Sequence, residues 1–143
     1  MAGRVSRAVR RRVAASARFR CGYCHTSQAV IGPLLEIDHL QPEALGGGSE
    51  EENLWLACPH CNGAKGSRVA APDPTTGEIV ALFNPRVERW SSHFQWVDGG
   101  ALIEGRTPVG RATVTALNMN HPDITAARRL WIEVGWHPPA DDD

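Results

Sequence analysis

Two Cys-x-x-Cys pairs constrain the fold of this chain more than any other feature of its sequence. Cys21 pairs with Cys24 and Cys58 with Cys61, and these are all the cysteines of the chain. Four thiolates complete the tetrahedron of a structural zinc ion, so the pairs predict one four-cysteine zinc site. The 33 residues between the pairs exceed the usual gap of a zinc ribbon, and two disulfides or a redox pair are the alternatives.

The length of the chain limits the size of its core. At 143 residues it has the size of one domain, in which a structural metal would add useful stability. No apolar run is long enough to cross a bilayer, and the N-terminus lacks the apolar segment of a secretory signal. Since a reducing cytoplasm keeps thiols free, we expect a cytoplasmic protein whose four cysteines bind zinc.

Charge is distributed unevenly along the chain. Residues 1–35 hold seven arginines and no acidic residue, whereas residues 36–143 hold eight basic and sixteen acidic residues. The two segments therefore carry net charges of +7 and −8. A basic segment of this kind attracts nucleic acid, and a solvated helix face is the alternative interpretation. The candidate nucleic-acid contacts in this segment are Arg10, Arg11 and Arg12.

Residues 36–66 carry side chains suited to the hydrolysis of a phosphodiester. The carboxylate of Asp38 suits a hard divalent cation such as Mg²⁺. The neutral imidazole of His39 can take a proton from water near pH 7. The amide oxygen of Asn62 is a second hard ligand that adds no charge. The ammonium group of Lys65 can hold a phosphate as a point charge.

In this order, the residues resemble the ββα-metal motif of the HNH endonuclease family. The motif consists of Asp/Glu-His, then Asn-Leu, then Cys-x-x-Cys-His/Asn-x-x-Lys. Each piece alone is weak evidence, but the ordered set is specific, and it covers residues 21–68, about a third of the chain. The matching segments here are Asp38-His39, Asn53-Leu54 and Cys58-Pro-His-Cys61-Asn62-Gly-Ala-Lys65.

The resemblance implies a set of catalytic roles. Asp38 and Asn62 would hold one divalent metal, and His39 would act as the general base on water, giving 5′-phosphate and 3′-hydroxyl products. Asn53 would fix the backbone or ring of His39 through a hydrogen bond. Asn62 departs from the histidine of the family name. Because an amide is a harder ligand than imidazole, this change favours Mg²⁺ or Mn²⁺ over Zn²⁺ or Ni²⁺.

The expected partner is DNA, with RNA as the alternative substrate and no membrane contact, and the protein would act as a monomer or homodimer. Lys65 and Arg68 would hold the flanking phosphates. A non-catalytic zinc module that binds nucleic acid or protein is the alternative function. Such a module needs only its cysteines, so the presence of Asp38, His39 and Asn62 favours the nuclease.

The predicted fold is α+β: an N-terminal basic helix, the ββα-metal motif with its four-cysteine zinc site, and a C-terminal β-hairpin with two helices. We expect residues 1–71 to form the basic helix and nuclease core, and residues 72–143 to pack on that core within a single domain. Periodicity and capping signals predict helices over 5–18, 62–69, 107–119 and 122–134, and strands over 34–39, 54–57, 79–83, 93–96 and 101–104.

Overall fold

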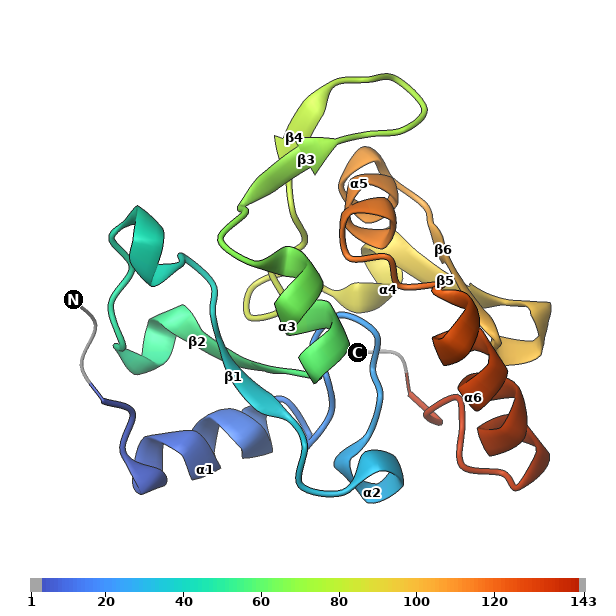
Figure 1. The fold of residues 1–143 in the computed structure, drawn as a ribbon, viewed down its shortest axis with the longest axis horizontal. Helices are drawn as coiled ribbons and strands as arrows, with labels where there is room; N and C mark the ends of the chain where they lie inside the picture. Colours follow the sequence, from blue (N-terminus) through green and yellow to red (C-terminus); the bar gives the residue numbers. More distant parts are fainter. Residues whose placement is uncertain (1–3, 142–143) are drawn as a thin grey trace. The chain divides into compact units, whose positions relative to one another are not determined.

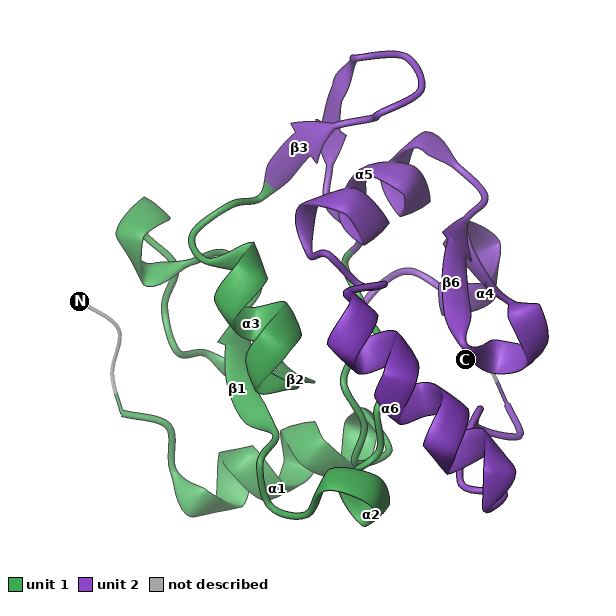
Figure 2. Ribbon diagram, turned by 45° about the vertical axis from the view of Figure 1, so that its right-hand side comes forward, with its two compact units in different colours: residues 1–69, 84–86 green, residues 70–83, 87–143 purple. Residues whose placement is uncertain are grey.

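The structure is a computed structural model in which residues 4–141 are described. The chain divides into two compact units: unit 1 comprises residues 1–69 and 84–86, and unit 2 comprises residues 70–83 and 87–143 (Figure 2). Both units combine helices with two-stranded antiparallel sheets (Figure 1), which confirms the predicted α+β class. Within residues 4–141, no helix combines the length and the apolar character needed to span a bilayer.

Unit 1 is built on a ββα arrangement. Strand β1 (Glu36–His39) pairs antiparallel with β2 (Leu54–Ala57), and helix α3 (Pro59–Lys65) follows β2 directly. Leu54 and Leu56 are 0% and 3% exposed. They lie on the same face of β2 because successive side chains of a strand alternate, and this face contributes to the core of the unit.

The first helix covers β2. Helix α1 (Arg7–Ser16) begins at the N-cap Ser6, whose hydroxyl accepts a hydrogen bond from the backbone N–H of Val9, and it buries Val13 and Ala14. Its arginines remain on the exposed side, as expected of an amphipathic helix. The shorter elements of unit 1 are α2 (Gln28–Ile31), η1 (Glu43–Leu45) and η2 (Glu51–Asn53).

Helix α3 begins earlier and ends earlier than the sequence pattern predicts. The Sγ atom of Cys58 accepts a hydrogen bond from the backbone N–H of Cys61, and Pro59 occupies the first turn. Both features are typical of a helix start. Gly66, with φ of 55°, ends the helix after Lys65. The helix therefore carries Cys61, Asn62 and Lys65 within a little more than one turn.

Residues 84–86 belong to unit 1, although they lie outside the expected segment 1–71. The guanidinium group of Arg86 donates to the backbone oxygens of Glu51 and Leu54 at 2.7 and 3.3 Å. It also lies over the ring of Trp55, 5.4 Å from the centroid. These contacts hold residues 84–86 against the start of β2.

A partly buried ion pair organises part of unit 2. Strands β3 (Ala70–Pro72) and β4 (Ile79–Ala81) form a hairpin, and the carboxylate of Asp73 begins its turn. Arg111, on helix α5 (Pro108–Ala116), donates two hydrogen bonds of 2.9 and 2.7 Å to this carboxylate, whose side chain is 0% exposed. The pair therefore joins the hairpin to α5.

The rest of unit 2 surrounds an aromatic core. Trp90 and Phe94 are 2% and 1% exposed, and their ring centroids are 5.2 Å apart. Phe83 meets Phe94 edge-on at 5.0 Å. The remaining elements are α4 (Trp90–His93), β5 (Phe94–Val97), η3 (Asp98–Gly100), β6 (Leu102–Gly105) and α6 (Pro122–Glu133), with β5 and β6 forming the expected hairpin.

Candidate active site

The four cysteines meet in one buried cluster in unit 1. Their Sγ atoms all lie within 4.8 Å of one another, and those of Cys24 and Cys58 are 3.6 Å apart. Four sulfurs around zinc at ~2.3 Å are ~3.8 Å apart, whereas a disulfide needs ~2.05 Å. The cluster fits a structural zinc ion, and it confirms the predicted grouping of Cys21, Cys24, Cys58 and Cys61.

The two cysteine pairs have the local geometry of metal-binding turns. The backbone N–H of Tyr23 donates to Cys21 Sγ, and that of Cys61 donates to Cys58 Sγ, each at 3.4 Å. Hydrogen bonds inside the cluster, the one with Cys21 first, hold the pKa of Cys24 well below its ordinary value. Burial raises the pKa of Cys21 well above its ordinary value, and hydrogen bonds with the other cysteines, Cys21 first, do the same for the pKa of Cys61. Of these three thiols Cys24 therefore ionises most readily, and the thiolate is the form that binds zinc.

Tyr23 connects the cysteine cluster to β1. It lies between the two cysteines of the first pair, is 0% exposed, and donates its hydroxyl hydrogen to Asp38 Oδ2 at 2.5 Å. Burial, followed by the negative charge of Asp38, raises the pKa of Tyr23 well above its ordinary value. The phenol therefore stays protonated and remains a donor.

Tyr23 was not among the site residues predicted from the sequence. The one available signal is general, because a tyrosine enclosed between two metal ligands needs a hydrogen-bond partner for its hydroxyl. That signal does not say which partner is chosen, and Asp38 lies 15 positions away in the chain.

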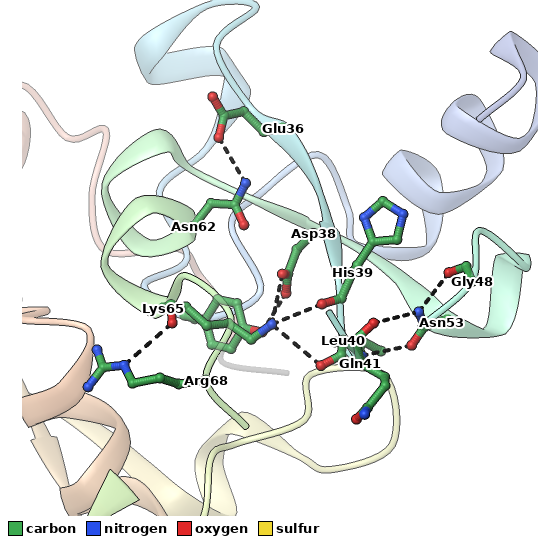
Figure 3. A network of polar contacts seen from close by, with 11 residues as sticks. Glu36, Asp38, His39, Leu40, Gln41, Gly48, Asn53, Asn62, Lys65 and Arg68 are labelled. Carbon is green, nitrogen blue, oxygen red and sulfur yellow. Dashed lines mark hydrogen bonds and ion pairs between the residues drawn. The ribbon is translucent and has the colours of Figure 1, made fainter. Parts of the chain in front are cut away.

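Lys65 approaches Asp38 from α3, as Figure 3 shows. Its Nζ atom donates to Asp38 Oδ1 and to the backbone oxygen of His39, both at 3.0 Å, and the side chain is 3% exposed. The sequence pattern predicts that this ammonium group holds a phosphate. The structure directs it inward instead, because a buried cation must be compensated by a carboxylate and by carbonyl oxygens.

Asn62 lies one helical turn before Lys65 and contacts a different residue of β1. Its Nδ2 atom donates to Glu36 Oε1 at 3.0 Å (Figure 3). Glu36 and Asp38 share one face of β1, while Asn62 and Lys65 share one face of α3. The strand and the helix are thus joined by two successive polar contacts. Glu36 was not among the predicted site residues.

His39 is the last residue of β1, so the strand ends at the Asp38-His39 pair as expected. The register places Asp38 opposite Trp55 and His39 opposite Leu54, which puts the two side chains on opposite faces of the β1–β2 ribbon. Figure 3 shows the imidazole pointing away from Lys65. The side chain is 20% exposed, so the ring is accessible and is not part of the core.

The loop after β1 contacts the His39 ring. Nε2 lies 3.1 Å from Ser49 Oγ and 3.5 Å from a carboxylate oxygen of Glu43. A carboxylate only accepts hydrogen bonds, so its contact favours the tautomer with the hydrogen on Nε2. That tautomer leaves Nδ1 as the basic nitrogen.

Asn53 does not contact His39 in the way the resemblance implies. Its side chain accepts from the backbone N–H of Gln41 at 2.8 Å and donates to the backbone oxygens of Gln41 and Gly48 at 3.0 and 2.8 Å. A side-chain amide offers one donor end and one acceptor end, so it can pair with a backbone as another peptide would. Asn53 therefore closes the 41–48 loop, which carries Glu43 and leads to Ser49.

The arginines predicted to contact nucleic acid are exposed. Arg10 and Arg11 lie on α1, and no hydrogen bond or ion pair ties the guanidinium group of either one to another residue in the described part of the chain. Arg12 donates to Glu51 at 3.0 Å from Nε and 2.9 Å from Nη2. Arg68 donates to the backbone oxygens of Ala64 and Lys65, which leaves its exposed guanidinium group near the end of α3.

Comparison with known proteins identifies one segment of the chain. Residues 21–68 match the sequence model of the HNH endonuclease family. No match was found among curated proteins or among solved structures. The matched segment contains both cysteine pairs, the β1–β2 ribbon and α3. Residues 21–68 therefore carry the sequence pattern of the HNH endonuclease family, and the two ends of this segment meet at a four-cysteine cluster suited to structural zinc.

Proposed function

We propose that this protein is a metal-dependent endonuclease that hydrolyses phosphodiester bonds in DNA. One observation carries the proposal: Asp38 and Asn62 lie on the facing elements β1 and α3, and the accessible His39 follows Asp38 at the end of β1, inside a segment that matches the HNH family. A zinc module without catalytic activity would need only its cysteines.

The donor atoms of Asp38 and Asn62 fit a hard divalent cation, for which we propose Mg²⁺ or Mn²⁺. Asn62 Oδ1 accepts no hydrogen bond from residues 4–141. Each oxygen of Asp38 has one donor, but an ionised carboxylate offers about four lone-pair sites, so ligand capacity remains. When bound, the metal would supply electrostatic stabilisation of the charge that develops on the phosphate and leaving oxygen.

In the proposed reaction His39 is the general base. Nδ1 accepts a proton from a water molecule, while Glu43 and Ser49 hold the other ring nitrogen. The water oxygen attacks phosphorus in line as the bond from phosphorus to the 3′ oxygen breaks. The 3′ oxygen takes a proton from solvent, so the products carry a 5′-phosphate and a 3′-hydroxyl.

Two residues support the base indirectly. Lys65 donates to the backbone oxygen of His39 and to Asp38, so it fixes the end of β1. Asn53 closes the loop that brings Glu43 and Ser49 to the ring. We propose that both act by positioning other groups, as outer residues of catalytic metal sites commonly do.

Binding of the nucleic acid would rest on the exposed arginines. Arg10, Arg11 and Arg12 on α1, and Arg68 after α3, present guanidinium groups that can pair with phosphate oxygens. Such contacts with phosphates do not distinguish one base sequence from another. We therefore expect nucleic-acid binding to weaken as the salt concentration rises.

A plasmid-nicking assay tests the proposal. Zinc-loaded protein should cut supercoiled DNA with added Mg²⁺ or Mn²⁺, and His39→Ala should reduce the rate by about 10²–10⁴-fold, the usual contribution of a general base. His121→Ala, which removes an imidazole from unit 2, is the matched control and should cut at the wild-type rate. Single-stranded RNA is run in parallel, since faster cleavage of RNA would change the assigned substrate.

The non-catalytic alternative has a clear outcome in the same assay. DNA binding without metal-dependent cleavage, in both the wild type and His39→Ala, would favour a zinc-stabilised binding module and reject the nuclease.

A further inference from the structure

We propose that Glu36 sets the orientation of the Asn62 amide, so that Asn62 presents its oxygen, and not its nitrogen, to a divalent cation. This inference rests on the proposed function, in which Asn62 is a metal ligand. An asparagine amide has two ends of nearly equal size, and only the oxygen can bind a metal ion. Some neighbour must therefore distinguish the two orientations.

The contact between Glu36 and Asn62 supplies this distinction. Asn62 Nδ2 donates to Glu36 Oε1 at 3.0 Å. Because a carboxylate accepts hydrogen bonds and cannot donate them, the nitrogen end of the amide must face Glu36. The chemistry of the pair, independently of the exact atomic positions, turns Oδ1 away from Glu36. Figure 3 shows this arrangement.

The spacing of β1 and α3 explains why the oxygen is useful where it lies. Glu36 and Asp38 are two positions apart on a strand, which separates them by about 6.6–6.8 Å along its axis. Asn62 and Lys65 are three positions apart on a helix, where neighbouring side chains are about 5–6 Å apart. The two spacings are similar, so contacts of 3.0 Å form at both levels, Glu36 with Asn62 and Asp38 with Lys65.

The amide oxygen is not otherwise used. Within residues 4–141, Asn62 Oδ1 accepts no hydrogen bond, and the Glu36 side chain has one hydrogen bond, the one with Asn62, and no ion pair. Asn62 is half-buried and Glu36 is exposed. An exposed carboxylate contributes little to folding stability, so its removal should act on the amide and leave the fold intact.

The test measures Mn²⁺ affinity and needs no nuclease activity. Zinc-loaded, full-length protein without DNA is titrated with MnCl2, and free Mn²⁺ is followed by electron paramagnetic resonance. Glu36→Ala removes the hydrogen bond altogether and so frees both the side-chain rotamer of Asn62 and the orientation of its amide. Binding should therefore weaken about tenfold, the lower end of the range for residues that support a metal ligand. Glu52→Ala removes the same charge from an exposed position in unit 1, and it should leave the affinity unchanged.

Two further variants separate orientation from direct ligation. Glu36→Gln keeps an oxygen acceptor but permits both orientations of the Asn62 amide. At most half of the protein molecules would then present the amide nitrogen to the metal, so the affinity for Mn²⁺ should fall about twofold. In an Asn62→Asp background both terminal atoms are oxygens, so Glu36→Ala should no longer weaken binding. If Glu36 bound the metal itself, Glu36→Gln would cost as much as Glu36→Ala, and the cost would persist in the Asn62→Asp background; either result overturns the inference.

The outcomes also separate this inference from the proposed function. Suppose that the protein shows metal-dependent cleavage that requires His39, but Glu36→Ala and Glu52→Ala bind Mn²⁺ with equal affinity. That result would overturn the role of Glu36 and leave the proposed nuclease function standing. Weakened Mn²⁺ binding in Glu36→Ala, combined with no cleavage by the wild type, would support the role of Glu36 and reject the nuclease. Zinc content and circular dichroism of each variant establish that it is folded.

Discussion

Removing the hydroxyl of Tyr23 should destabilise unit 1 by more than the loss of an ordinary surface hydrogen bond. In Tyr23→Phe the ring remains, but Asp38 Oδ2 loses its donor at 2.5 Å. Tyr23 and Asp38 are 0% and 2% exposed, so water cannot replace the hydroxyl without rearrangement. A hydrogen bond to a charged group contributes about 1.5–3 kcal/mol to the free energy of unfolding. For a chain of this size the melting temperature should fall by roughly 5–10 °C.

Urea and thermal denaturation of the zinc-loaded protein measure this effect. The zinc content should not change, since Tyr23 is not a ligand. In an Asp38→Asn background the hydrogen bond from Tyr23 joins two neutral groups. There, Tyr23→Phe should lower the free energy of unfolding by only about 0.5–1.5 kcal/mol. Thr115→Val, which removes an exposed hydroxyl, should cost less than about 0.5 kcal/mol. An unchanged melting temperature, or an equal cost in both backgrounds, would refute the reasoning.

The same variant has a pH signature. The folded protein holds the pKa of Tyr23 above its ordinary value, while the unfolded chain ionises near pH 10. The contribution of Tyr23 to stability is therefore complete below about pH 10 and is lost as the pH rises towards the folded pKa. The difference in stability between the wild type and Tyr23→Phe should shrink above about pH 10. A difference that stays constant up to about pH 11 would count against a protonated, donating phenol.

Two further predictions concern zinc and acid stability. Cys58→Ser removes one of four clustered thiolates, so we expect loss of zinc and of the fold of unit 1; full zinc retention with an unchanged melting temperature would contradict this. The hydrogen bonds from Arg111 are the main reason that the pKa of Asp73 is lowered to about 2. The contribution of this pair to the free energy of unfolding is therefore complete above about pH 4 and is lost as the pH falls towards 2. Arg111→Met should remove that acid-dependent part of the unfolding free energy, and an identical pH dependence of the melting temperature in both proteins would argue against it.

Features that depend on local chemistry could be predicted from the sequence. Cys21 and Cys58 each begin a Cys-x-x-Cys pair, and two thiolates at this spacing can bind the same metal ion. The β1–β2 ribbon follows from alternating apolar residues such as Leu54 and Leu56. The start of α3 differs from the prediction, because Cys58 acts both as a cysteine of the cluster and as the cap of the helix.

The sequence by itself determined which chemical groups unit 1 contains, namely four thiolates, an Asp-His pair and two asparagines in HNH order. Only the tertiary structure decided how the polar groups pair. Lys65 turns inward to Asp38, Tyr23 reaches the same carboxylate, and Asn53 closes a loop. The physical reason is that a buried donor must find an acceptor, but many acceptors would satisfy it. The packing of β1 against α3 and against the cysteine turns selects one of them.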